Sequence, residues 1–414
     1  MKRRIIPGVL SLILMFSASG CGVSAQAADL MTHINANPVD TDAKPAGAAS
    51  SAVEDFSVKL FQNSASSDQN TLLSPLSVLC ALAMTANGAK NETLVQMEDV
   101  FGLSVPELNK YMHAYLKHLP SSGKYKFNIA DSIWFKDGNG LTVDPDFLQT
   151  NADYYGASIY KAPFDESTLK HINNWVDDHT DHMIPNILDS ISPSAVMYLI
   201  NALAFDAEWE TLYNETQIQD GTFTTESGEK QDVKMMHSQE YQYLDDGSAT
   251  GFIKYYVDQK YAFAALLPNK DVSIKDYIAS LTGEGLMTTL ENAQGVQVNT
   301  VIPKFKNEYS LEMNDVLKSM GMTDAFDADN ADFSGLGQAK GENISIGKVL
   351  HKTYIAVDER GTRAGAATSV EMRTTGMLAE KPKEVCLDRP FVYMIIDCET
   401  NLPIFIGATT KISQ

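Results

Sequence analysis

Cysteine is scarce in this chain of 414 residues: only four are present, too few for a fold held by a disulfide framework. With 15 prolines and 26 glycines, the chain is also too poor in both for a fibrous or low-complexity protein. Positive charge is scarce as well, because 32 Lys and Arg stand against 53 Asp and Glu, a net charge of −21. An acidic surface repels nucleic acid and anionic lipid, so neither is expected as a partner. A globular composition remains, with 44% hydrophobic residues.

Residues 1–21 have the pattern of a signal peptide. Lys2, Arg3 and Arg4 form a basic start, and the apolar stretch 5–16 is too short to span a bilayer. Small residues precede Cys21, as in the lipobox of bacterial lipoproteins, so lipidation of Cys21 is predicted. Ordinary secretion, with cleavage at a later small residue, is the alternative. Either pathway makes the protein extracellular, and a lipid on Cys21 would anchor it to the bacterial cell surface.

The rest of the chain divides into a tether and one domain. Residues 22–52 are rich in Ala, Ser, Asp, Asn and Pro without an apolar period, which predicts a flexible tether. Residues 53–414 contain no linker or repeat and mix helical with strand patterns, which predicts a single α+β domain. Three cysteines remain there, an odd number, and are expected to be buried free thiols: Cys80, Cys386 and Cys398.

Local patterns predict several elements of this domain. Ser74 and Pro75 are suited to the first positions of a helix that ends at Gly88. Apolar periodicity predicts further helices and buried strands: helices over 91–101, 169–183 and 311–320, and strands over 196–205, 391–396 and 403–408. Asn201 interrupts the first of these strands. Because a buried amide needs hydrogen-bond partners, Asn201 predicts a polar network inside the core.

Motifs of enzymes and of metal sites are absent. The chain has no Gly-x-Ser-x-Gly elbow, no phosphate-binding glycine loop and no His-Glu-x-x-His helix. His179 and His182 are three residues apart but lack a third ligand. The acidic run 327–332 lacks the glycine and glutamate of a calcium loop. We therefore predict no enzyme activity and expect no metal or cofactor.

The segment that follows Glu359 has two conflicting properties. Its alanines and glycines are poor strand formers, so the simplest interpretation is an exposed flexible loop. A period of two nevertheless places small or apolar residues at 362, 364, 366, 368, 370 and 372 and polar residues at 363, 369, 371 and 373. As a strand, the segment would present one small-residue face to a core and the other to water.

At several places the chain resembles the serpin family, over the whole of residues 53–414. The matching motifs, in chain order, are NTLLSPLS at 70–77, INNWV at 172–176, LINA at 199–202, VIPKF at 301–305, ADFSG at 331–335, VLHK at 349–352 and DRPF at 388–391. The resemblance implies the serpin fold, an α+β fold with three β-sheets, about nine helices and an exposed reactive-centre loop. That loop corresponds to about residues 359–385 here.

In inhibitory members of the family, the loop is the segment that the target protease attacks. A protease cleaves it, forms an acyl-enzyme, and is trapped when the cut loop inserts as a new central strand. The resemblance therefore implies a monomeric suicide inhibitor of serine proteases, with cysteine proteases as a second target class. A non-inhibitory serpin that binds ligands or assists folding is the second hypothesis, although such members usually carry bulky or charged hinge residues. A solute-binding surface lipoprotein is the third, supported only by the anchor and tether.

The resemblance also implies residue roles. The hinge, where insertion begins, comprises Glu359, Gly361, Thr362, Arg363, Ala364, Gly365, Ala366, Ala367 and Thr368. Arg363 departs from the family, in which an acid is usual. A polar cluster under the sheet that opens comprises Ser74, Ser77, Asn201 and His351. Trp209 is expected under the upper end of that sheet, where Lys304 would pair with Glu359.

The family spacing from Gly361 predicts a scissile bond between Thr375 and Gly376. A small β-branched residue before the cut suits elastase-like proteases with shallow apolar pockets. Because the segment from Gly376 to Pro390 is long, other residues stay candidates for the position before the cut. They are Thr374, Arg373 for trypsin-like enzymes, and Met377 or Leu378 for chymotrypsin- or subtilisin-like enzymes.

Overall fold

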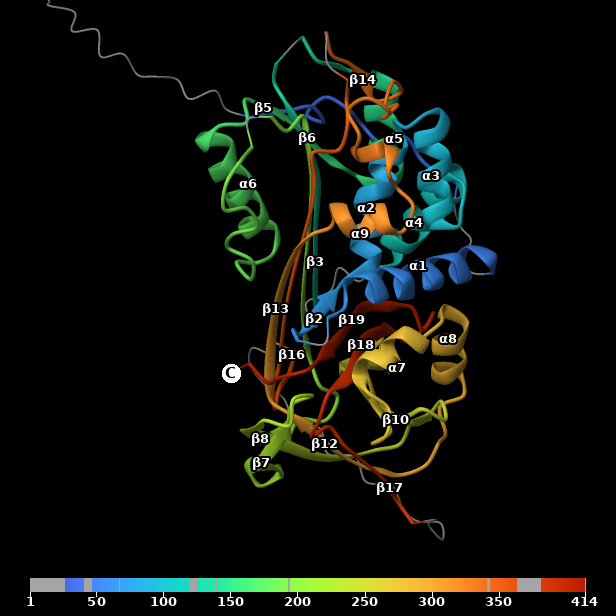
Figure 1. Cartoon of the computed structure of the whole chain (residues 1–414), viewed down its shortest axis with the longest axis vertical. Helices are drawn as coiled ribbons and strands as arrows, with labels where there is room; N and C mark the ends of the chain where they lie inside the picture. Colours follow the sequence, from blue (N-terminus) through green and yellow to red (C-terminus); the bar gives the residue numbers. More distant parts are fainter. Residues whose placement is uncertain are drawn as a thin grey trace, which may run out of the picture.

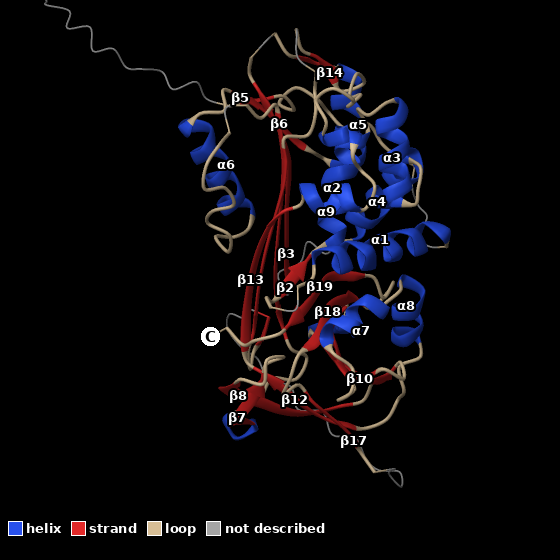
Figure 2. Cartoon of the chain, viewed as in Figure 1, coloured by secondary structure: helices blue, strands red, loops and turns tan. Residues whose placement is uncertain are grey.

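The computed structural model describes residues 27–40, 47–66, 68–119, 125–138, 140–192, 194–340, 343–362 and 381–413. These ranges contain nine α-helices, three large β-sheets and one two-stranded sheet (Figures 1 and 2). The predicted α+β fold is confirmed. The helices are α1 (Ala48–Ser64), α2 (Pro75–Ala86), α3 (Asn91–Phe101), α4 (Val105–His118), α5 (Pro145–Tyr155), α6 (Glu166–His179), α7 (Ile274–Ser280), α8 (Gly283–Glu291) and α9 (Asn314–Ser319).

A long central sheet organises the molecule. Its seven strands, in spatial order, are β1 (Ala28–Asp29), β5 (Ser158–Ala162), β3 (Tyr125–Lys136), β6 (Met197–Glu208), β16 (Gly361–Thr362), β15 (Lys348–Val357) and β13 (Phe305–Glu312). In Figure 1, α6 lies on one side of this sheet, and α2, α3, α4, α5 and α9 lie on the other. In this view the sheet is covered on both faces in its upper half, where α6 lies opposite the helices of the other face.

Two further sheets lie toward the lower half of Figure 1. The six-stranded sheet has the order β2 (Thr71–Leu73), β19 (Pro403–Thr409), β18 (Phe391–Asp397), β11 (Tyr261–Pro268), β10 (Ala249–Tyr255) and β9 (Tyr243–Asp245). The four-stranded sheet has the order β17 (Lys383–Cys386), β12 (Val298–Pro303), β8 (Lys230–Glu240) and β7 (Ile218–Thr224). The small sheet joins β14 (Gly337–Gln338) to β4 (Thr142–Val143).

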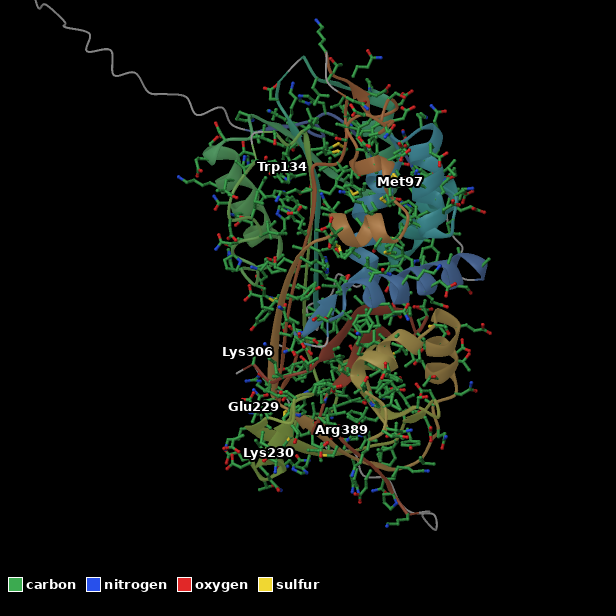
Figure 3. The ribbon with its side chains drawn as sticks, viewed as in Figure 1. Met97, Trp134, Glu229, Lys230, Lys306 and Arg389 are labelled. Carbon is green, nitrogen blue, oxygen red and sulfur yellow. The ribbon has the colours of Figure 1, made fainter. Side chains whose placement is uncertain are left out.

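Helix α2 begins as the sequence predicts. The Ser74 hydroxyl accepts a hydrogen bond from the Ser77 amide at 3.3 Å, and Pro75 occupies the first helical position. Every residue of α2 is buried, so this helix is the centre of the core. On the other face of the central sheet, Trp134 stacks on Tyr160 with ring centroids 4.4 Å apart (Figure 3).

The structure differs from the predicted tether over residues 27–40 and 48–52. Strand β1 pairs with β5, and the Leu30 amide donates to the Ile159 carbonyl at 2.9 Å. Leu30, Met31 and Ile34 pack against the core, and α1 already begins at Ala48. A strand of two residues is stabilised by its distant partner and not by a local period, which is why composition alone did not reveal it.

Three smaller predictions also need correction. Met183 lies beyond the end of α6, and Leu311 belongs to strand β13, so the two helices predicted there were too long. The three described cysteines are free thiols, but only Cys80 is buried, and Cys386 is exposed. Cys386 belongs to the edge strand β17, in which alternate side chains face solvent.

Within the described ranges, no helix has both the length and the apolar character needed to cross a bilayer.

Candidate functional site

The line between β6 and β15 is the most unusual feature of the central sheet, and we call it the seam. Along most of the seam the two strands pair directly and in parallel, from Tyr198 opposite Lys348 to Ala204 opposite Tyr354. At one end, which we call the mouth, β16 lies between them. Gly361 is opposite Glu208, and Thr362 is paired with Ala207 on β6 and Val357 on β15. Strands β6 and β15 therefore pair directly along most of the seam and are separated by Gly361 and Thr362 at the mouth.

The first two residues of the mouth fit tightly. The Thr362 side chain is fully buried, and its hydroxyl forms a 2.5 Å hydrogen bond with that of Tyr256. Gly361 has a φ of +154°, and a Cβ there would lie 2.0 Å from the Ala207 carbonyl oxygen. Only glycine allows this approach of the two backbones. The mouth thus selects a glycine followed by a small side chain.

The segment that leads into the mouth is held by two aromatic residues. The Trp209 indole N–H donates to the Asp358 carbonyl at 2.8 Å, and the Trp209 amide donates to the Arg360 carbonyl at 2.9 Å. The Tyr213 amide donates to the Glu359 carbonyl at 3.0 Å. Trp209 also stacks on Tyr256, with ring centroids 4.5 Å apart. Residues 358–360 are therefore fixed before the chain enters the sheet.

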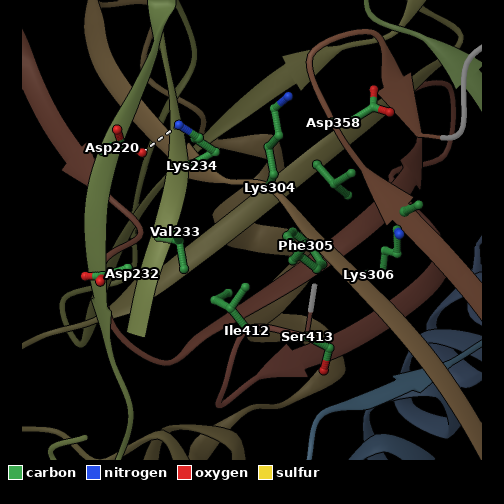
Figure 4. A pocket seen from close by; sticks show the side chains of 12 residues that line it. Asp220, Asp232, Val233, Lys234, Lys304, Phe305, Lys306, Asp358, Ile412 and Ser413 are labelled. Atoms are coloured by element: carbon green, nitrogen blue, oxygen red, sulfur yellow. Dashed lines mark ion pairs between the residues drawn. The ribbon is translucent and has the colours of Figure 1, made fainter. Parts of the chain in front are cut away.

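Lys304 and Glu359 form the expected ion pair beside the mouth. Burial tends to raise the pKa of Glu359, but the hydrogen bond and charge of Lys304 outweigh it and hold that pKa below its usual value. The pair lies next to a cavity of about 360 Å³ with Lys304 and Asp358 on its rim (Figure 4). Its floor is apolar and is formed by Val233, Phe305, Val357 and Ile412.

A polar row crosses the closed part of the seam. Asp131 on β3, Asn201 on β6 and His351 on β15 are cross-strand neighbours in register. The Asn201 amide donates to Asp131 and to the Ser77 hydroxyl, while its oxygen accepts from His351 Nδ1. At the N-terminal cap of α2, the Ser74 amide donates to His351 Nε2 at 3.2 Å. All four residues that the resemblance assigned to this cluster therefore lie together.

The hydrogen-bond pattern assigns the charge state of His351. Since Nε2 accepts from a backbone amide, the proton of the neutral ring is on Nδ1, where it can be donated to Asn201. Burial lowers the pKa of His351 to about 3, so the ring is neutral at physiological pH. A neutral ring inside the sheet avoids the large penalty of a buried charge.

Asp131 is the member of the row that the sequence analysis missed. Burial raises its pKa to about 7, although hydrogen bonds from Cys80, Asn201 and Ser77 act in the opposite direction. Burial, followed by the charge of Asp131, raises the pKa of the Cys80 thiol well above its usual value. The one available signal was an acid inside the apolar strand pattern of 125–136. Its position opposite Asn201 follows only from the register of β3 and β6.

The remaining predicted residues of the loop and the anchor lie outside the described residues. They are Cys21, the hinge residues Arg363, Ala364, Gly365, Ala366, Ala367 and Thr368, and the candidates for the scissile bond, Arg373, Thr374, Thr375, Gly376, Met377 and Leu378.

One group of side chains within the described ranges has ligand atoms close enough to approach a metal ion, and it comprises Asp177, Asp178 and His182. Two of the three are exposed, and His182 already forms a 2.7 Å hydrogen bond with Asp177. Exposed acids next to a histidine are common without an ion, so the arrangement does not indicate a metal site.

Comparison with known proteins identifies the class of this molecule. Residues 51–412 match the family model described as serpin (serine protease inhibitor), so the chain belongs to the serpin family of protease inhibitors, which are not enzymes. Human Serpin B8 is 30% identical over 368 residues, covering 85% of this chain and 96% of its own.

Among solved structures, the chain is similar to a thermophilic serpin, tengpin. Its native-state structure is 49% identical, covers 94% of this chain and 100% of its own, and superposes with a TM-score of 0.89. The latent-state structure of tengpin is 47% identical, covers 89% of this chain and 100% of its own, and gives a TM-score of 0.79. The described conformation therefore resembles the native state more than the latent one.

Proposed function

We propose that this serpin is a suicide inhibitor of serine endopeptidases that acts by inserting its cleaved reactive loop along the seam. The observation that carries the proposal is the mouth: Gly361 and Thr362 already occupy the position of an inserted strand, while β6 and β15 still pair directly beyond them. Cleavage of the loop would release its remaining residues to follow the same path.

The register at the mouth gives the proposed path residue by residue. Thr362 is opposite Ala207 on β6 and Val357 on β15. If this antiparallel register continues, residues 363–372 run opposite 206–197, which is the full remaining length of β6. Thr368 then falls between Asn201 and His351 and replaces their direct contact. Strand alternation would give 364, 366, 368, 370 and 372 the buried orientation of Thr362, which agrees with the period of two in the sequence.

Insertion of this length can supply enough free energy to disable a protease. Roughly ten residues would form about ten additional backbone hydrogen bonds, each worth ~1 kcal/mol net. The resulting gain is on the order of 10 kcal/mol, comparable with the stability of a typical folded domain. A protease attached to the moving end through an acyl bond would therefore be distorted before hydrolysis releases it.

The proposed targets are elastase-like proteases cleaving between Thr375 and Gly376. This bond lies three residues beyond Met372, the last position opposite β6 in the extended register. The test is incubation with a pancreatic-type elastase, followed by a denaturing gel. We expect an adduct of protease and inhibitor that survives denaturation, and mass spectrometry of the released peptide should identify the cut. Cleaved protein without adduct, across a panel of serine proteases, would instead support a non-inhibitory serpin.

The insertion mechanism has a sharper test at the mouth. Thr362→Arg places a charge where the side chain is fully buried, so insertion should stall at its first step. We expect the variant to be cleaved as a substrate, with adduct formation reduced by about 100-fold or more, since burying an unpaired charge costs several kcal/mol. Arg363→Ala is the matched control, because residue 363 would have the opposite orientation in an inserted strand, and its adduct yield should match that of the wild type.

We also propose that the mature protein is a lipoprotein on the outer face of a bacterial cell. The support is the lipobox-like sequence that ends at Cys21. Metabolic labelling with a fatty acid, together with the Cys21→Ser variant, tests it. Label on the wild type and none on the variant is expected, whereas an unlabelled wild type would favour simple secretion.

A further inference from the structure

We propose that Lys254 is a positioning residue for loop insertion, which holds Trp209 and Tyr213 in the orientation that anchors residues 358–360 at the mouth. The inference rests on the proposed inhibitory function and adds a residue that acts on the hinge through Trp209 and Tyr213, without contacting the hinge itself. It concerns a charged group on the neighbouring sheet, in strand β10.

Lys254 is a lysine inside the core. Its side chain is 2% exposed, and its ammonium lies 2.8 Å from a carboxylate oxygen of Glu240 and 3.4 Å from the Thr211 carbonyl. The same ammonium faces two aromatic rings, 4.6 Å from the centroid of Tyr213 and 5.4 Å from that of Trp209. A buried ammonium is unfavourable unless it is paired and hydrogen-bonded, and two of the residues that surround it here, Trp209 and Tyr213, also hold residues 358–360.

The two rings that Lys254 contacts belong to the residues that hold the hinge. Trp209 binds the carbonyls of Asp358 and Arg360, and Tyr213 binds that of Glu359. The attraction between a cation and the face of a ring depends on the ring plane. Lys254 therefore restrains the plane of Trp209, and with it the direction of the indole N–H toward Asp358.

Glu240 completes the arrangement. Its carboxylate accepts a hydrogen bond from Ser238 at 2.7 Å, and the Ser238 hydroxyl lies 3.1 Å from that of Tyr213. The contacts thus form a ring that runs from Lys254 through Glu240, Ser238 and Tyr213 back to Lys254. Burial tends to lower the pKa of Lys254, but Tyr213 and Glu240 outweigh it and hold the pKa above its usual value, so the side chain is charged at neutral pH.

An uncharged side chain of similar shape would fill the same space without restraining the rings. A hinge that is held in place begins insertion from a fixed position, and insertion then competes better with hydrolysis of the acyl-enzyme. Loosening Trp209 and Tyr213 should therefore slow insertion and let more protease escape.

The test compares Lys254→Met with Lys254→Arg, which keeps the charge, and with Lys161→Met. Lys161 is the control because it pairs with Asp137 at 3.3 Å on β5, which is separated from the seam by β3. The measured quantity is the number of inhibitor molecules consumed for each protease trapped. We expect an increase on the order of 3- to 10-fold for Lys254→Met, the loss of a buried cation–π contact, and values within about 2-fold of wild type for the other two.

A second measurement needs no protease. Hydrogen exchange of the Trp209 and Tyr213 amides, which donate to the hinge carbonyls, should be faster in Lys254→Met than in wild type and in Lys254→Arg. If Lys254→Met fails to fold, Lys254→Met/Glu240→Gln removes the orphaned charge and carries the same predictions.

The outcomes are distinguishable. If wild type traps no protease, the proposed function fails, while the exchange rates still decide whether Lys254 holds the anchors. Two results would overturn the inference and show that Lys254 is merely structural. One is a Lys254→Met variant with a lower melting temperature but unchanged hydrogen exchange at the Trp209 and Tyr213 amides. The other is a wild type that traps protease and a Lys254→Met variant that consumes the same number of inhibitor molecules for each protease trapped.

Discussion

The mouth and the polar row lie on the same seam but are built on different chemistry. At the mouth, Gly361 and Thr362 separate β6 from β15, and the contacts are backbone hydrogen bonds, aromatic rings and a partly exposed ion pair. At the polar row, Asn201 joins β6 directly to β15 through His351; Asn201 and His351 are buried, and Asp131 is half-buried. One end of the seam is already open, and its middle is closed by side chains.

In the proposed loop insertion, this difference separates two tasks. The mouth would fix where insertion starts and which residue types can enter. The polar row would set a barrier farther along, because the bond between Asn201 and His351 would have to break before a strand passes between them. Changes at the polar row should therefore alter the stability of the native state strongly, whereas changes in the exposed pair at the mouth should alter it little.

The largest effect is expected at the centre of the polar row. Asn201→Ala removes a hydrogen-bond partner of the buried Ser77 and His351 and of the half-buried Asp131. We expect a loss of about 2–4 kcal/mol from the free energy of unfolding, measured by denaturant titration. Asn128→Ala, half-buried on β3, is the control and should cost below about 0.5 kcal/mol. Equal losses for the two variants would contradict a closing role for Asn201.

An intermediate effect is expected from the titration of Asp131. Burial raises its pKa from 3.8 to about 7, so between these pH values the native state binds more protons than the unfolded state. The contribution of Asp131 is therefore present below pH 4 and is lost as the pH rises to about 7. His351 has the opposite sign: its pKa is lowered to about 3, so its contribution is lost as the pH falls from about 6.5.

The measurement is the difference in stability between Asp131→Asn and wild type from pH 4 to 8. Because both proteins contain His351, the difference isolates Asp131. We expect it to shift in favour of the variant as the pH rises, by up to about 4 kcal/mol, from a pKa difference of about three units. Asp137→Asn, at an exposed site, is the control. A flat profile for Asp131→Asn would mean that Asp131 is ionised throughout.

The smallest effect is expected for Glu359→Gln at the mouth. The Lys304 and Glu359 side chains are 29% and 36% exposed, so water and salt screen their attraction. We expect a loss below about 1 kcal/mol at low ionic strength, and none at about 1 M salt. A larger loss that persists in salt would show that the mouth contributes to stability as strongly as the polar row.

Much of this architecture follows from local sequence. The Ser74 cap, the buried strand around Asn201 and the two apolar strands near the C-terminus are all encoded by short patterns, and the structure contains each of them as Ser74, β6, β18 and β19. The need of a buried amide for partners also predicted a polar network at Asn201, without naming its members. These features share one property: neighbouring residues determine them.

Other features depend on strand register and cannot be found locally. Asp131 joins the polar row only because β3 aligns it with Asn201, and Lys254 is stable in an apolar strand only because Glu240 lies beside it. Strand β1 is likewise stabilised by β5 and not by its own two residues. Long-range strand pairing brings each of these residues to its partner, and a shift of the strand register by one residue would remove the contact.

The central claim is that the cut loop follows the seam in the register set at the mouth. A crystal structure of the loop-cleaved protein tests it most directly. We expect residues 363–372 to form a full strand between β6 and β15, with Thr368 between Asn201 and His351. An Asn201 that still contacts His351 in that crystal, with β6 and β15 paired as in the uncleaved chain, would contradict insertion along the seam.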